Sequence, residues 1–131
     1  MAAKIEHLEG SAFVKSRAYS PAVITEGGRI VWLAGQTAPT DESGKAIPCD
    51  IEAQTHTCFA LIDKTLRRAG GSLANLVWMT VFISDPRYGD PFVKIRADKF
   101  PDGRFPCSTL ITVSTFPQPG VVIEVQGIAV I

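Results

Sequence analysis

One carboxylate interrupts an apolar stretch in the last part of this sequence. Glu124 lies within "VVIEVQGIAVI", which otherwise has the β-branched composition of a buried strand. The two-residue period of a strand places Glu124 beside Gln126 on one otherwise apolar face. A buried carboxylate without a partner is costly, so two hypotheses remain. Either Glu124 faces solvent or pairs with a subunit neighbour, or it lines a cleft, where a raised pKa lets it position or deprotonate a water molecule.

The other reactive side chains form no recognisable catalytic motif. The sequence has no phosphate-binding loop, no His-Glu-x-x-His zinc motif, no Cys-x-x-Cys pair and no Gly-x-Ser-x-Gly nucleophile elbow. His7 and His56 are far apart, so we predict no metal site. Cys107 could act as a nucleophile if Arg104 lowered the pKa of its thiol, although a small structural thiol is the more common role.

The first half of the chain contains two expected strands and one expected helix. We predict strands at 22–25 and 29–34, joined as a β-hairpin by a Glu-Gly-Gly turn. A polar loop then leads to an amphipathic helix, for which Asp50 is the expected N-cap. The pair Gly70-Gly71 should end this helix.

The second half continues with a strand, a short helix and two strands. The strand is "LVWMTVFISD", and the helix is "DPFVKIRADKF", with Asp90 as the expected cap. The last strands should span 109–114 and 121–130. This order predicts an α+β fold, in which helices cover one face of a mixed sheet. The apolar character of the other face favours oligomerisation.

Length, charge and cysteine content indicate how many domains, which partners and which compartment to expect. The 131 residues suit one domain, 1–131, that buries its core without disulfides or metals. Thirteen basic residues balance thirteen acidic ones, so we expect no nucleic-acid partner and no attraction to a membrane surface. Three widely spaced cysteines favour free thiols in a reducing compartment. With no apolar targeting or membrane-spanning segment in the sequence, we expect a cytoplasmic protein.

Three stretches carry a family likeness across nearly the whole chain. They are "AYSPAV" with "VWLAGQ", then "DIEAQTHTCFALIDKTLRRAGGSLANLVWMTVFISD", and last "FPCSTLITVSTFPQPGVVIEVQGIAV". With them the sequence resembles the YjgF/RidA family of reactive intermediate deaminases, formerly described as L-PSP endoribonucleases. The resemblance implies a chorismate-mutase-like α+β fold with two helices on one face of a mixed sheet. It also implies a homotrimer with a barrel-like centre and clefts between subunits, which hydrolyses enamines and imines without a cofactor.

The family's site residues carry over unevenly. Its aromatic residue falls on Tyr19 and its last-strand glutamate on Glu124. The glycine of its Ser-Gly-Gln motif falls on Gly35, whereas the serine is replaced by alanine. The family pattern Phe-Pro-Ala-Arg-Ser aligns with "FPCST", so Ser108 stands where the archetypal arginine binds the substrate carboxylate, and Thr109 follows it.

The missing arginine matters because a hydroxyl cannot reproduce the bidentate clamp of a guanidinium. Arg104 or Arg96 could substitute for it. We expect a hydrolase or deaminase of this family in which Glu124 orients or activates water against a C=N bond or a related electrophile, and Tyr19 closes the cleft. Ser108, Thr109 and Gly35 should bind the substrate, a small carboxylic, 2-oxo or imino acid. The alternative is a trimer that binds a metabolite without catalysis. An endoribonuclease fits poorly with zero net charge.

Overall fold

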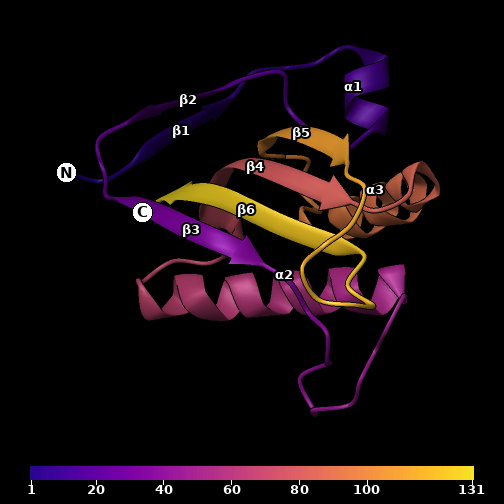
Figure 1. The fold of residues 1–131 in the computed structure, drawn as a ribbon. Coiled ribbons are helices and arrows are strands. Elements are labelled where there is room, and N and C mark those ends of the chain that lie inside the picture. The colour runs from indigo at the N-terminus through magenta and orange to yellow at the C-terminus, as the bar shows by residue number, and fades with distance from the viewer.

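A mixed four-stranded sheet dominates the computed structural model, which describes residues 1–131 (Figure 1). Its strand order is β3-β6-β4-β5, with antiparallel β3/β6 and β6/β4 pairs and a parallel β4/β5 pair. The strands are β3 (Ile30–Gln36), β4 (Leu76–Ile83), β5 (Cys107–Thr112) and β6 (Ile123–Val130). The α+β class predicted from the sequence is therefore confirmed.

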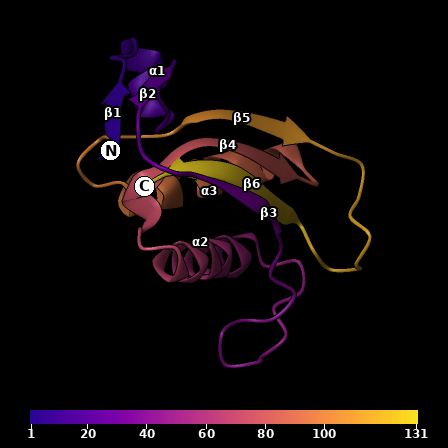
Figure 2. The ribbon, with the colours of Figure 1, turned by 90° about the vertical axis from the view of Figure 1, so that its left-hand side faces the viewer.

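Two helices, α2 (Ile51–Arg68) and α3 (Gly89–Lys99), pack together beneath one face of this sheet (Figure 2). Asp50 caps α2 as predicted, since its carboxylate accepts a hydrogen bond from the Ala53 amide at 3.0 Å. The predicted cap of α3 is wrong. Tyr88 holds that position, and Asp90 lies inside the first turn because a 3₁₀ turn at Pro86–Tyr88 leads directly into the helix.

The predicted β-hairpin is also wrong. The strand β2 (Val23–Glu26) pairs with β1 (Lys4–His7) in a separate two-stranded ribbon, whereas β3 pairs with β6. Gly27 and Gly28 both have positive φ, at 68° and 76°, and they redirect the chain from the ribbon into the sheet instead of folding it back. The apolar β3 gains more burial beside β6 than it would in an isolated two-stranded hairpin.

The ribbon and the short helix α1 (Ala12–Ser16) lie beyond the β5 edge of the sheet (Figures 1 and 2). Sequence periodicity did not predict β1 or α1, since each is only four or five residues long. Ser20 holds this segment in place: its hydroxyl donates to the Phe105 carbonyl at 2.6 Å, and its amide donates to Pro106. The N-terminal part of the chain is thereby brought against β5.

The face of the sheet opposite the helices is open and apolar. Trp32 is 74% exposed and Ile30 is 58% exposed on β3, while Trp78 on β4 and Ile111 on β5 are also exposed. Large aromatic side chains seldom remain in water as a group on one sheet face. This pattern agrees with the uncovered apolar face expected from the sequence.

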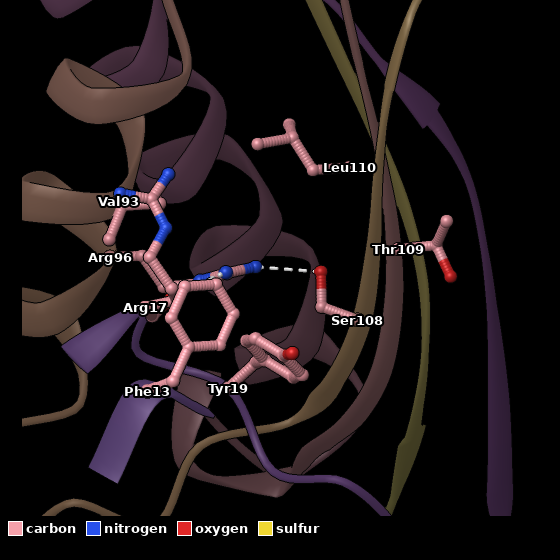
Figure 3. Close-up of a pocket in the computed structure, with 8 residues that line it drawn as sticks. All are labelled: Phe13, Arg17, Tyr19, Val93, Arg96, Ser108, Thr109 and Leu110. Atoms are coloured by element: carbon pink, nitrogen blue, oxygen red, sulfur yellow. Dashed lines mark hydrogen bonds between the residues drawn. The ribbon is translucent and has the colours of Figure 1, made fainter. Parts of the chain in front are cut away.

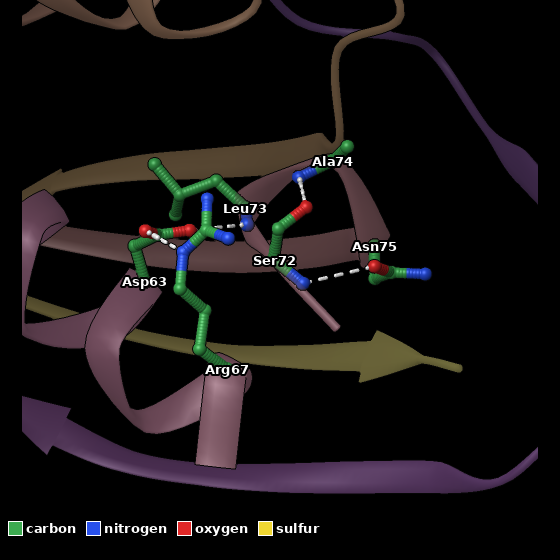
Figure 4. Close-up of polar contacts among 6 residues, drawn as sticks. All are labelled: Asp63, Arg67, Ser72, Leu73, Ala74 and Asn75. Carbon is green, nitrogen blue, oxygen red and sulfur yellow. Dashed lines mark hydrogen bonds and ion pairs between the residues drawn. The ribbon is translucent and has the colours of Figure 1, made fainter. Parts of the chain in front are cut away.

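A polar junction connects α2 to β4 (Figure 4). Asp63 accepts hydrogen bonds from Arg67 Nε at 2.7 Å and from the Leu73 amide at 2.9 Å. Ser72 and Asn75 form a reciprocal capping box in the turn that follows. Partial burial raises the pKa of Asp63, but the hydrogen bonds from Arg67 and the Leu73 amide outweigh it, so the pKa lies below its ordinary value.

Replacing Asp63 with asparagine should destabilise the protein by about 1–2 kcal/mol at pH 7, because charge-assisted bonds to a helix and a turn are lost. A carboxyl with a lowered folded pKa stabilises above its unfolded pKa and stops doing so as the pH falls through the folded value. The difference between variant and wild type should therefore shrink only at acid pH. Urea unfolding across a pH series measures it, and Asp98→Asn, at an exposed and unbonded position, is the matched control. An unchanged difference at the lowest pH would contradict the assignment.

Candidate functional site

The predicted site residues fall in two separate places on the chain. Glu124 and Gly35 lie together on β6 and β3, at the open side of the sheet. Tyr19 and Ser108 line a cavity on the helix side, at the β5 edge. A single subunit therefore does not bring Glu124 and Ser108 together.

Glu124 lies within β6 and pairs across the sheet with Phe82 of β4. The alternation predicted for this strand is confirmed: Ile123 and Val125 are fully buried in the core, whereas Glu124 and Gln126 are half-buried on the other face. The Glu124 carboxylate makes no ion pair and no hydrogen bond within the chain. It is therefore free to bind a water molecule or a ligand.

Gly35 gives the Glu124 carboxylate the room that it occupies. It lies in the irregular segment of β3 between Leu33 and Gln36, where the pairing with β6 shifts register. A Cβ atom at position 35 would overlap the Glu124 carboxylate. Glycine is thus required by the close approach of a side chain to the backbone.

The thiols near these groups are poor nucleophiles. Burial raises the pKa of the Cys58 thiol to about 12, and the negative charge of Glu124 adds to the effect. Cys107 donates a hydrogen bond to the Val77 carbonyl at 3.2 Å, and partial burial raises the pKa of its thiol as well. Neither sulfur is activated as a thiolate in the chain by itself.

The cavity at the β5 edge has a volume of about 310 Å³, within the range of small-molecule sites (Figure 3). It is lined by α1, the segment after α1, α3 and β5. Tyr19 and Ser108 face each other across its lower part, and Leu110 points into it from above. Val93 lines it from α3.

Thr109 borders this cavity but does not point into it. Its side chain projects from the side of β5 opposite Ser108 (Figure 3). Strand register pairs Thr109 with Thr80, which in turn pairs with Gln126, so Thr109 shares the open face with Glu124. Ser108 and Thr109 therefore belong to different surfaces of the same chain.

Of the two arginines that could replace the missing family arginine, Arg96 reaches the site. Arg96 Nη1 donates to Ser108 Oγ at 2.7 Å from its place on α3. Arg104 is exposed and approaches only the Ile5 carbonyl, at 3.5 Å. The cavity also contains Arg17 and Phe13, which the sequence does not predict because no periodic pattern marks their segment.

No group of three or more His, Cys, Asp or Glu side chains comes together as a metal site. No helix combines the length and the apolar character needed to cross a membrane.

Comparison with known proteins agrees with this fold. The family model "Endoribonuclease L-PSP" matches residues 9–131. A RutC family protein of Pyrococcus abyssi is 30% identical over 85% of this chain and 84% of its own length. The structure of YyfB of Yersinia pestis, from the conserved Rid protein family, superposes with a TM-score of 0.84 at 22% identity and covers all of both chains.

A third comparison is with Escherichia coli TdcF, solved with bound serine, which has a TM-score of 0.69 and 25% identity and covers 81% of this chain and 84% of that one. The fold is thus the α+β fold of Rid proteins. The chain belongs to the endoribonuclease L-PSP family, which is the YjgF/RidA family that its sequence resembles.

Proposed function

We propose that this protein is a Rid-type hydrolase that adds water to the C=N bond of a small imine or enamine and releases ammonia. The observation that carries the proposal is the Glu124 carboxylate, which is half-buried, free of partners and held against Gly35. A carboxylate of this kind can orient a water molecule and take a proton from it.

The chemistry requires no cofactor. Starting from the protonated imine, the water oxygen forms a bond to the carbon, the electrons of the C=N double bond move to nitrogen, and Glu124 takes one proton from the water, which leaves a carbinolamine. Glu124 then gives that proton to the amine nitrogen. The C–N bond breaks as the hydroxyl group loses its proton to solvent, so ammonia leaves and the carbon keeps its oxygen as a carbonyl group. Tyr19 closes the cleft over the substrate, Ser108 binds its carboxylate, and Thr109 donates a hydrogen bond from the open face.

The active unit in this proposal is a homotrimer, in which Glu124 and Thr109 of one subunit meet the Tyr19 and Ser108 cavity of the next. Two observations support it. Glu124 and Ser108 lie on opposite faces of one sheet, and the open face carries exposed Trp32 and Trp78 that an adjacent subunit would cover. The serine bound to the related TdcF supports a ligand with the size and carboxylate of an amino acid.

A coupled assay tests the activity. An amino-acid oxidase generates a 2-imino acid in solution, and ammonia release is followed with and without the purified protein while semicarbazide traps the surviving imine. We expect the protein to accelerate release and light scattering to report three 14.1 kDa chains. No acceleration over the spontaneous rate would refute the hydrolase. Binding of the 2-oxo acid without acceleration would instead support a metabolite-binding trimer.

A further inference from the structure

Arg96 is a buried guanidinium without a carboxylate partner. Its residue is only 2% exposed, and no Asp or Glu lies within ion-pair distance of it. Its Nη2 donates to the Arg17 carbonyl at 3.0 Å, its Cζ atom lies 4.9 Å from the centre of the Phe92 ring, and its buried Nε has no acceptor. A buried charge is costly unless it is paired, so this cation calls for an anion that the chain itself does not supply.

Ser108 links the Arg96 guanidinium to the cavity through a hydrogen bond. Its Oγ accepts the Arg96 Nη1 hydrogen at 2.7 Å, so its own hydroxyl hydrogen is left to donate elsewhere. Figure 3 shows the Ser108 oxygen at the end of the hydrogen bond from the Arg96 guanidinium and above the Tyr19 ring, at the wall of the cavity. A hydroxyl that accepts from a cation is a stronger donor, because hydrogen bonds in a chain polarise one another.

The charges around the cavity match a single negative group. Arg17 and Arg96 line it, and Asp90 alone opposes them, through an ion pair with Arg17 Nη1 at 2.8 Å. One positive charge is therefore uncompensated. Phe13, Val93 and Leu110 supply apolar walls that suit a short hydrocarbon chain.

We infer that Ser108, backed by Arg96 from α3, binds the carboxylate of a small monoanionic ligand in this cavity. Ser108 on β5 and Arg96 on α3 thus together replace the single arginine that binds the substrate carboxylate elsewhere in the family. Ser108 touches the ligand, and Arg96 is a positioning residue that polarises and orients the Ser108 hydroxyl. The inference deepens the proposed function, because it assigns the charge of the substrate and the residues that select it.

The test is ligand binding, which needs no turnover. We would titrate 2-oxobutanoate and its neutral amide, 2-oxobutanamide, into the full-length protein by calorimetry and map the contacts by amide chemical shifts. Wild type should bind the carboxylate at least about 10-fold more tightly than the amide, as expected for a hydrogen bond to a charged group. Shifts should centre on Ser108 and Val93.

Variants of Ser108 and Arg96 distinguish a role in carboxylate binding from a role in stabilising the fold. Ser108→Ala and Arg96→Gln should each weaken 2-oxobutanoate binding by about 10- to 100-fold and abolish the preference over the amide. Arg96→Lys should retain part of that preference, since the charge remains. Lys94→Gln, at an exposed position on the same helix, should change nothing. Ser108→Ala keeps the test decisive if Arg96→Gln does not fold.

Equal affinities of wild type for the carboxylate and the amide would overturn the inference, as would undiminished 2-oxobutanoate binding by Ser108→Ala. Failure of the proposed function is a different result: 2-oxobutanoate would still bind with the charge preference, but imines would hydrolyse no faster than in buffer.

Discussion

Glu124→Gln should reduce protein-accelerated ammonia release by about 100-fold or more, the usual loss when a positioned general base is removed. Glutamine keeps the size and the hydrogen-bonding oxygen of the side chain but cannot accept a proton from water. Stability should hardly change, because the Glu124 carboxylate has no ion pair or hydrogen bond to lose. Initial rates with an oxidase-generated 2-imino acid measure the effect.

Two further variants sharpen this result. Gly35→Ala should also lower the rate, because its added methyl group displaces the Glu124 carboxylate without altering the charge. Glu42→Gln, at an exposed loop position, removes one carboxylate elsewhere and should leave the rate unchanged. If Glu124→Gln releases ammonia as fast as wild type, Glu124 has no part in activating water.

Gln54→Leu should lower the free energy of unfolding by about 3–5 kcal/mol, the largest stability effect that we expect for a polar residue here. Gln54 lies on α2 and is fully buried. Its Nε2 donates to the carbonyls of Ile47 and Gly120, each at 2.8 Å, and its Oε1 accepts from the Val122 amide at 3.0 Å. Leucine fills the same space but leaves the Ile47 carbonyl and the Val122 amide without partners, while the Gly120 carbonyl keeps only its bond from the Cys49 amide at 2.8 Å.

Chemical denaturation measures this loss, and His56→Leu is its control, since it places the same side chain at an exposed position of the same helix. Similar unfolding midpoints for Gln54→Leu and wild type would show that the Ile47 carbonyl and the Val122 amide find other partners. Because Gln54 ties down the segment immediately before β6, we also expect its loss to loosen the approach to Glu124.

The sequence predicts the helices and strands that show a regular hydrophobic period. It does not predict features that depend on contacts between segments far apart in the chain. The helix after Asp50 and the alternation around Glu124 follow from local periodicity, and both are confirmed. The partner of β2 could not be predicted in this way, because its neighbour β1 is too short to show a period. The family pattern identified Ser108 as an exception, but only the packing of α3 against β5 shows that Arg96 lies beside it. Gln54 gave no signal, because its partners lie in two irregular segments, one before α2 and one before β6.

The strand order has a consequence for how this chain folds during synthesis. The sheet is built as β3-β6-β4-β5, so its last strand in sequence occupies an interior position. Until β6 leaves the ribosome, β3 has no partner strand in the sheet and β4 can pair only with β5, so the backbone groups that β6 will bind stay open on both strands. Pairing over such sequence separations slows folding and lengthens the time in which chains can aggregate. Chaperone dependence should therefore be concentrated in the interval before β6 emerges.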